Sequence, residues 1–352
     1  MPRAAYIRII RHRFDEYPDL TVSTSPSIFF TEMTKTTYND PSSVVPINLM
    51  VFSGAFNWPV WVAQDRGLFA RNGLTVNVSE TPGSVVQWTS LAEGRSDIAI
   101  TLMDNVVAYR EGQGEAPVTV ADAIAVMASD ALLMPALMTQ PDIKTYDDLR
   151  GQTLSVDAAL TGLALILYAL LEKGGLKPGD YRIVRTGGVL RRFEGLKRNE
   201  FAGALFNAPF STQLEKLGYR SLDTAASVMQ HYQGHVVATR NGWARENSRA
   251  LQGFLRALSD AIDWLYDSTN TADAFAIFRD HMSASDDKAA GIAYSVLFDP
   301  KSGFARNGAI DIDGIAKVLE LRSRFGQPAK PLGEPSRYFD LSYLETALGD
   351  SR

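Results

Sequence analysis

The fold is decided by residues 47–111, which read INLMVFSGAFNWPVWVAQDRGLFARNGLTVNVSETPGSVVQWTSLAEGRSDIAITLMDNVVAYRE. Strand-like runs at residues 47–51, 74–78 and 97–101 alternate with helix-like segments, and each predicted strand ends in a loop. In an α/β sheet, the loops at the carboxyl ends of the strands bind small molecules. The stretch therefore predicts an α/β sheet with open loops along one edge, at residues 53–59, 81–84 and 103–105.

A second α/β unit is predicted between Thr139 and Val237, with three strands and a helix at residues 161–173. Its strands are predicted at residues 154–156, 181–184 and 203–206. Apolar runs within residues 121–140 fit strands that cross from the first unit, and residues 236–239 bring the chain back. Two crossings predict two lobes joined by a hinge, with a ligand cleft between them.

The predicted division has three parts. Residues 1–44 form a poorly ordered leader, because they are rich in Ser, Thr, Pro and charge. Lobe 1 is discontinuous and comprises residues 45–138 plus 238–348, whereas lobe 2 comprises residues 139–237. Amphipathic helices that cover lobe 1 are predicted at residues 247–267, 272–281 and 312–325.

Several motifs resemble one known family. In the first half they are Trp58–Phe69, Gly73–Val76 and Leu91–Ala99, and later Thr145–Leu154, Gly175–Tyr181 and Phe339–Leu348. Together they resemble the NMT1/THI5-like branch of solute-binding proteins, which is similar to the nitrate, sulfonate, taurine and thiamine-pyrimidine receptors of ABC importers. The resemblance covers residues 45–348. It implies the periplasmic-binding-protein type 2 fold, in which each of two lobes is a mixed sheet flanked by helices.

Composition agrees with an ordered, globular binding protein. The 352 residues include 35 basic and 40 acidic side chains, so the formal charge is 35 − 40 = −5 and nucleic acid is not expected as a partner. The chain contains no cysteine. This excludes disulfides, thiolate metal sites and a cysteine nucleophile within the sequence.

The N-terminal residues do not read as an export signal. The apolar run of a signal peptide is about 7 to 15 residues long, whereas arginines interrupt the stretch from Ala4 to Arg11. The longest apolar run, Leu163–Leu171, is shorter than the ~20 residues of a membrane span. The family resemblance implies a periplasmic protein, and a genuine start at Met1 would imply a cytoplasmic one.

The resemblance implies a receptor that closes around an unmodified solute. A solute that contacts both lobes stabilises the closed state by its extra affinity for that state, and the membrane subunits of an ABC permease then recognise the loaded receptor. We expect a monomer with no cofactor and no catalytic residue. The predicted ligand-binding residues from lobe 1 are Ser53, Phe56, Asn57, Thr81, Gly83, Ser84, Met103, Asp104 and Asn105. Those from lobe 2 are Asp157, Thr161, Gly162, Asn207, Ala208, His231 and Tyr232.

Two hydroxyl residues precede predicted helices. Ser84 and Thr161, with the first free backbone amides, could hold an oxyanion, although both also fit the simpler interpretation of ordinary N-caps. Phe56 lies in an open loop and could stack on a planar ligand.

The charge of Asp104 bears on the chemistry of the ligand. A carboxylate at the ends of the strands favours a ligand with an amine and opposes a simple anion unless a cation lies beside it. The first three loops contain no arginine, and the nearest candidate cations in the second lobe are Arg185, Arg191 and Arg192. Arg191 and Arg192 precede a predicted helix, where an arginine is more often solvated, so a pure nitrate-like or sulfonate-only site is not expected. The sequence therefore leaves an amino-sulfonate, a pyrimidine-like heterocycle or a small aromatic acid open as the ligand.

His231 and His235 have the spacing of a metal-binding pair on a helix. Gly234 between them indicates a loop that passes into a strand, and no nearby acidic residue completes a ligand set. The sequence therefore predicts hydrogen bonding or packing for these histidines and no metal.

The alternative is a cysteine-free lyase or hydrolase on the same fold, acting on a small aromatic or heterocyclic substrate. Asp104, Asp157 or His231 would then serve as general base. The enzymes that resemble this family depend on cysteine, which this chain lacks. A receptor is therefore the preferred interpretation.

Overall fold

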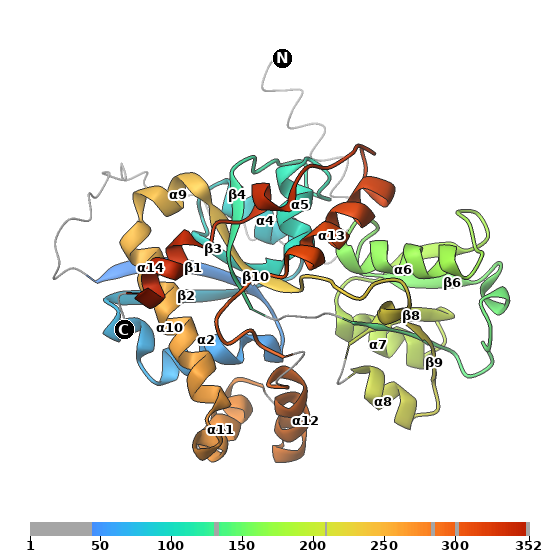
Figure 1. Ribbon diagram of the computed structural model, residues 1–352. Helices are drawn as coiled ribbons and strands as arrows, with labels where there is room; N and C mark the ends of the chain where they lie inside the picture. The colour runs from blue at the N-terminus through green and yellow to red at the C-terminus, as the bar shows by residue number, and fades with distance from the viewer. Residues whose placement is uncertain (1–43, 130–133, 208–209, 283–285, 300–302, 350–352) are drawn as a thin grey trace, which may run out of the picture. The chain divides into compact units, whose positions relative to one another are not determined.

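The computed structural model describes residues 44–129, 134–207, 210–282, 286–299 and 303–349. Almost all of the predicted leader lies outside the described residues. The described part contains two five-stranded sheets, and both combine parallel with antiparallel strands. The predicted fold class, two mixed sheets flanked by helices, is therefore confirmed (Figure 1).

The first sheet has the strand order β2-β1-β3-β10-β4. Its strands are β1 (Val45–Phe52), β2 (Leu74–Thr81), β3 (Ile98–Leu102), β4 (Ala123–Ala128) and β10 (His235–Arg240). β1 runs parallel to β2 and β3, whereas β10 runs antiparallel to β3 and β4. The carboxyl ends of β1, β2 and β3 therefore meet at one edge of the sheet, as the sequence predicts.

The second sheet has the order β7-β6-β8-β5-β9. Its strands are β5 (Ala136–Thr139), β6 (Thr153–Val156), β7 (Arg182–Arg185), β8 (Gly203–Phe206) and β9 (Arg220–Thr224). β6 runs parallel to β7 and β8, and β5 runs antiparallel to β8 and β9. Because β5 begins at residue 136 and β10 at residue 235, both predicted lobe boundaries fall within strands rather than between them.

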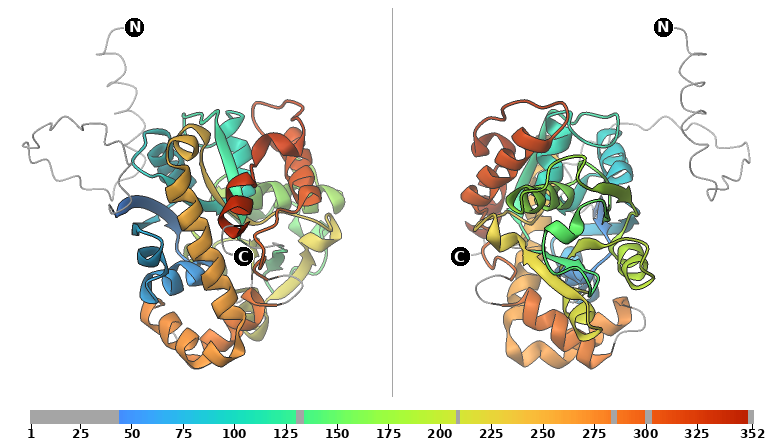
Figure 2. Two further views of the ribbon diagram at one scale, coloured as in Figure 1. Left: turned by 60° about the vertical axis from the view of Figure 1, so that its left-hand side comes forward. Right: turned by 90° about the vertical axis from the view of Figure 1, so that its right-hand side faces the viewer.

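One face of the first sheet is covered by helices rich in aromatic and branched side chains. Figure 2 shows α10 running along this side of the sheet. Its buried residues Leu251, Phe254, Leu258 and Ile262 recur at helical spacing. They share a core with Ile47, Leu49 and Val51 of β1, whose side chains alternate with more exposed ones. The helices of this layer are α2 (Trp58–Asp65), α3 (Leu68–Arg71), α10 (Ser248–Tyr266), α11 (Thr271–His281), α12 (Asp287–Leu297) and α14 (Ser342–Gly349).

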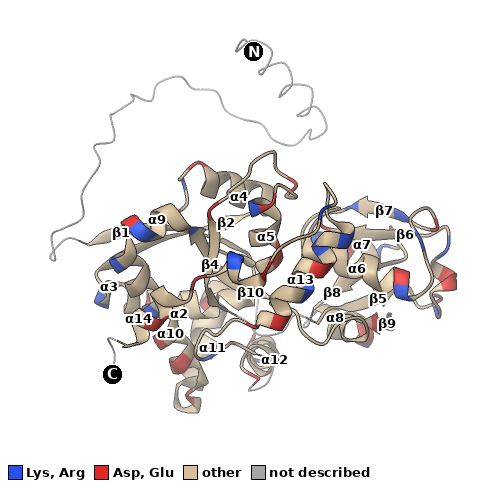
Figure 3. Ribbon diagram, turned by 45° about the horizontal axis from the view of Figure 1, so that its top comes forward, with Lys and Arg blue, Asp and Glu red and all other residues tan. Residues whose placement is uncertain are grey.

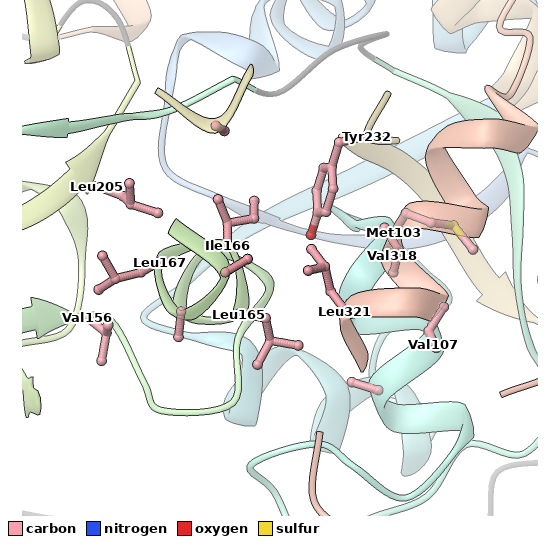
Figure 4. Packing of buried hydrophobic residues seen from close by; sticks show 14 of the residues in the cluster. Met103, Val107, Val156, Leu165, Ile166, Leu167, Leu205, Tyr232, Val318 and Leu321 are labelled. Carbon is pink, nitrogen blue, oxygen red and sulfur yellow. The ribbon is translucent and has the colours of Figure 1, made fainter. Parts of the chain in front are cut away.

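A second core joins the two sheets. It contains side chains of α4 (Ser84–Ala92), α5 (Met103–Arg110), α6 (Gly162–Lys173) and α13 (Ile312–Phe325), together with Leu154 and Leu205 of the second sheet. Figure 4 shows Tyr232 and Leu321 between Leu165 and Ile166 of α6 and Val107 of α5. The two sheets are therefore connected by shared apolar packing as well as by the two strand crossings.

The opposite face of the second sheet has a smaller core. Phe193 and Leu196 of α7 (Val189–Lys197) pack with Met138 and Phe206, and Leu214 of α8 (Phe210–Lys216) completes the cluster. The remaining elements are η1 (Ala55–Asn57), η2 (Asp147–Leu149), η3 (Ala225–Ser227), α9 (Asn241–Glu246), η4 (Ser268–Asn270) and η5 (Pro335–Tyr338).

Charged residues are interspersed along the described ribbon. Figure 3 shows acidic and basic residues alternating on α13 and over the second sheet. This distribution agrees with the near-balance of charge in the sequence and offers no extended basic stripe along these elements. Among the described residues, no helix is both long and apolar enough to cross a bilayer.

Candidate functional site

Ser53 directly follows β1, and Phe56 lies in the short helix η1 that comes next. Ser53 is exposed, and its hydroxyl donates a hydrogen bond to the Glu80 carboxylate at the end of the neighbouring strand. Phe56 is half-buried and stacks on His235, with 4.4 Å between ring centroids and 19° between planes. Both residues keep exposed surface on the predicted edge.

Three other predicted residues of this edge are buried and bonded locally. The Asn57 side-chain amide donates to the Phe52 carbonyl at 2.7 Å, and the Thr81 hydroxyl donates to the Gly83 carbonyl at 2.7 Å. The Asn105 amide donates to the Thr101 hydroxyl at 3.0 Å. These side chains fix the loops that leave the strands. The Asn57 Oδ1 atom is buried without a hydrogen-bond partner, so one polar atom here is unsatisfied.

Ser84 and Thr161 occupy different positions at their helices. Gly83 is the N-cap of α4 and Ser84 its first residue, so the N-cap interpretation of Ser84 is wrong. Thr161 is the N-cap of α6 and accepts from the Ala164 amide at 3.4 Å, while its hydroxyl donates to Asp157 Oδ1 at 2.7 Å. Thr161 therefore orders the start of α6 and orients Asp157.

Met103 is predicted to bind the ligand, but the structure places it in the core. Met103 begins α5 and is fully buried in the core that joins the two sheets. The sequence placed it at the strand end correctly, but its side chain points into apolar packing and offers no exposed surface to a solute.

Asp104 requires a larger correction. The sequence predicts a ligand-binding carboxylate, whereas Asp104 is buried and accepts two hydrogen bonds from Arg322 of α13. Arg322 Nε lies 2.7 Å from Oδ1 and Nη2 lies 2.6 Å from Oδ2. This planar, two-point ion pair neutralises Asp104, so the argument for an amine-bearing ligand no longer holds. Sequence reasoning missed Arg322 because it lies 218 residues away.

The ion pair also contacts the loop before α6. Arg322 Nη2 donates to the Leu160 carbonyl at 2.6 Å. A Cβ atom on Gly162 would lie 2.5 Å from the Tyr232 hydroxyl and 2.8 Å from the Asp104 Cβ, so this approach requires glycine. Gly162 is therefore a packing residue where α6 meets α5.

Tyr232 is fully buried beside this ion pair. Burial raises the pKa of Tyr232 well above its ordinary value, the Asp104 charge adds to the rise, and the Arg322 charge opposes it. Its phenol is thus neutral, and its ring belongs to the core (Figure 4).

Arg192 of α7 is buried, although its position before a predicted helix favoured a solvated side chain. It is only 4% exposed, and its Nη1 donates to the Leu205 carbonyl, near the end of β8, at 3.1 Å. Its guanidinium carbon lies 5.8 Å from the centroid of the Phe206 ring. Nε is buried without a hydrogen-bond partner, and within the described part of the chain no carboxylate forms an ion pair with Arg192. Burial lowers the pKa of Arg192, and the Asp157 charge opposes that shift.

The loops around Arg192 follow parallel strands of the second sheet. Asp157 follows β6, Thr186 follows β7 and Asn207 follows β8, and the first and last of these are half-buried. Gly187 and Gly188 lead into α7, and a Cβ atom on either would have nothing within 4 Å. No side chain caps α7. Ala208 lies outside the described residues.

His231 lies on the segment between β9 and β10. It is exposed, and its Nδ1 is 3.0 Å from Asp311 Oδ2. The expectation that no acidic residue completes a ligand set holds for the local sequence only, because Asp311 and Asp313 approach His231 from the start of α13. His231 and Asp311 are 80 residues apart in the chain, so no local sequence pattern indicates that they meet.

Some of the predicted ligand-binding residues thus have exposed surface in the structure, whereas others are buried. Those with surface at the strand ends are Ser53, Phe56, Gly83, Ser84, Asp157 and Asn207. Val85 and Val86 beside them are 43% and 42% exposed, so apolar surface is present as well. These strand ends offer hydroxyl and amide groups and one aromatic ring, and Arg192 adds a buried cation. Groups of these kinds occur in sites that bind small organic molecules.

The chain was compared with a set of protein-family models and with curated proteins. A family model described as NMT1/THI5 like matches residues 57–272, which is more than half of the chain. A search of curated proteins finds no match.

Solved structures show the same fold at low identity. A protein from Bordetella bronchiseptica RB50 has a TM-score of 0.72 at 16% identity and covers 87% of this chain and 98% of its own. The periplasmic aliphatic sulphonate binding protein SsuA from Escherichia coli has a TM-score of 0.62 at 18% identity, covering 81% and 87%. The desulfurization enzyme DSZB has a TM-score of 0.58 at 14% identity, covering 87% and 100%. On its family match, this chain belongs to the NMT1/THI5-like family.

Proposed function

We propose that this protein is the solute-binding receptor of an ABC importer. The observation that carries the proposal is the family match over residues 57–272, joined to a fold with two mixed sheets and two strand crossings. The likeness to the sulphonate-binding protein of Escherichia coli supports the same role. The solute would lie between the strand-end loops of the two sheets, and its partners would be the membrane subunits of a permease. A periplasmic location and a monomeric state belong to this proposal.

The charges indicate a solute with an acidic group. Asp104 is neutralised by Arg322, whereas Arg192 is buried with an unfilled donor and no ion pair within the described part of the chain. A buried cation is stabilised by an acceptor or an anion. The open backbone at Gly187 and Gly188 gives such a group room to approach the start of α7. Among the ligands that the sequence left open, an amino-sulfonate and a small aromatic acid therefore fit better than a neutral pyrimidine.

An enzyme on the same fold is the second candidate, because the desulfurization enzyme DSZB shares the fold. It is less well supported. Asp104, one of the three bases considered, is fully engaged by Arg322. His231, another, is hydrogen-bonded to Asp311.

A thermal-shift panel tests the proposal directly. Purified protein is heated with ethanesulfonate, taurine, benzoate, thymine or putrescine, and each compound is afterwards quantified by mass spectrometry. We expect a concentration-dependent rise in melting temperature with at least one acid, and full recovery of that compound, because a ligand that binds only the folded state stabilises it.

Two other outcomes of the thermal-shift panel would contradict the proposal. Conversion of a bound compound would assign the protein to the enzyme class. A rise with thymine or putrescine and none with any acid would contradict the acidic solute.

A further inference from the structure

His231 lies on the segment that carries the chain from β9 of the second sheet to β10 of the first. Its ring faces the first turn of α13. His231 Nδ1 and Asp311 Oδ2 are 3.0 Å apart, and one ligand atom from each of His231, Asp311 and Asp313 lies within 4.8 Å of the other two. An imidazole and two carboxylates thus converge from two segments about 80 residues apart in the chain.

The backbone holds these segments together. Gln233 Oε1 accepts a hydrogen bond from the Asp311 amide at 2.8 Å. A Cβ atom on Gly314 would lie 2.4 Å from the Gln233 amide nitrogen and 3.0 Å from the Tyr232 carbonyl carbon, so only glycine permits this approach. The first turn of α13 is therefore fixed against the segment that bears His231.

Helix capping does not account for the two carboxylates. Asp311 is the N-cap residue of α13, yet its side chain makes no capping hydrogen bond and instead contacts His231. Asp313 has no hydrogen bond or ion pair among the described residues, and Lys317, one turn further along α13, pairs with Glu320. Negative charge near a helix N-terminus is favourable in itself, but that effect does not require the side chains to converge on a histidine.

We propose that His231, Asp311 and Asp313 bind a divalent transition-metal ion of the zinc type. Imidazole nitrogen and carboxylate oxygen are both zinc ligands, and a site with three protein ligands leaves a coordination position for water. A divalent cation also balances the two negative charges of Asp311 and Asp313. A pocket of about 540 Å³, lined by His231 and Asp313 together with Ser227 and Gln230, gives the ion and its water access from solvent.

A metal ion at this site would also affect one of the connections between the two sheets. A bound ion would tie the segment between β9 and β10 to α13, and α13 packs against both α5 and α6. The metal would thus stiffen one of the two crossings between the sheets. This inference does not depend on the identity of the solute.

Calorimetric titration of ZnCl₂ into the full-length protein, purified without a polyhistidine tag, tests the site. We expect one ion per chain, with His231→Ala and Asp313→Asn each weakening the affinity at least about tenfold. ZnCl₂ should also raise the melting temperature of the wild type more than that of either variant.

His281 provides a matched control. Its Nε2 lies 3.0 Å from Asp65 Oδ2, and this pair belongs to no three-ligand cluster among the described residues. His281→Ala should therefore leave zinc affinity unchanged. If His231→Ala fails to fold, as judged by circular dichroism, His231→Gln replaces it. Absence of zinc binding by the wild type, or equal zinc affinity in the wild type and the folded His231 variant, would overturn the proposal.

Discussion

Arg322 and Arg192 are both buried, but their partners differ. Arg322 is fully buried, binds both oxygens of Asp104 and donates further to the carbonyls of Leu160 and Gln113. Arg192 has one carbonyl acceptor, from Leu205, and an unfilled Nε. A satisfied buried ion pair mainly maintains an arrangement, whereas an unsatisfied buried cation is costly unless something binds it. We therefore assign Arg322 to the architecture and propose Arg192 for the solute.

The largest expected effect is on the stability of Arg322→Met. This change leaves the Asp104 carboxylate buried without its cation, which costs about 3–5 kcal/mol of unfolding free energy. Urea denaturation followed by circular dichroism measures the loss. Arg324→Met is the matched control on the same helix, because Arg324 is 44% exposed and its pairs with Glu320 and Glu172 lie at the surface. The control should cost at most about 1 kcal/mol.

The double variant Asp104→Asn with Arg322→Met sharpens this test. Removing both charges should cost less than the sum of the two single changes, because neither charge then remains unpaired. If Arg322→Met costs no more than Arg324→Met, the Asp104–Arg322 pair does not stabilise the architecture as assigned.

The strands of the first sheet were predictable from sequence. Residues 47–51, 74–78 and 97–101 alternate or cluster apolar side chains, and the structure places β1, β2 and β3 over them. The order of strand, loop and helix also identified the edge on which the loops meet. Local periodicity and family motifs therefore gave the architecture correctly.

The charges of the site were not predictable in the same way. Arg322 reaches Asp104 across 218 residues, and no local pattern records such a pairing. A weaker signal was present, because Arg322 continues the buried series Ile315, Val318 and Leu319 at helical spacing. Arg192 likewise lies four residues before buried Leu196. An arginine within an apolar stripe is thus a candidate buried charge.

A smaller expected effect concerns Arg192→Met and the acid that gives the greatest rise in melting temperature. Losing a charged hydrogen bond to the solute, worth about 1.5–3 kcal/mol, should weaken affinity about 10- to 100-fold. Calorimetric titration measures the change. Stability should change by less than about 1.5 kcal/mol, since only one backbone hydrogen bond is lost.

Arg191→Met is the control for this variant, because Arg191 is adjacent, carries the same charge and is exposed. It should leave solute affinity unchanged. A loss of stability for Arg192→Met comparable with that for Arg322→Met, at unaltered affinity, would make Arg192 a structural residue and remove the contrast between the two arginines.

The smallest expected effect comes from Glu111, whose environment lies between those of Asp104 and a surface carboxylate. Its side chain is 13% exposed, accepts from the Tyr338 hydroxyl at 2.9 Å and pairs with Lys330 Nζ at 2.8 Å. Burial alone would raise the pKa of Glu111, but the hydrogen bonds from Lys330 and Tyr338 outweigh it and lower the pKa. Burial and the Glu111 charge together raise the pKa of Tyr338 to about 12.

The sign of the pH dependence follows from the lowered pKa of Glu111. The folded protein holds the proton less tightly than the unfolded chain, so the contribution of Glu111 is complete above the ordinary glutamate pKa of about 4.3 and is lost as pH falls through the folded value. At pH 6, urea denaturation should therefore give Glu111→Gln a lower unfolding free energy than the wild type, by less than about 1 kcal/mol. The unfolding free energies of the two proteins should converge as the pH falls. Glu345→Gln, at an exposed position of α14, should match the wild type throughout. A constant difference between Glu111→Gln and the wild type at every pH would show that Glu111 contributes through packing and not through its charge.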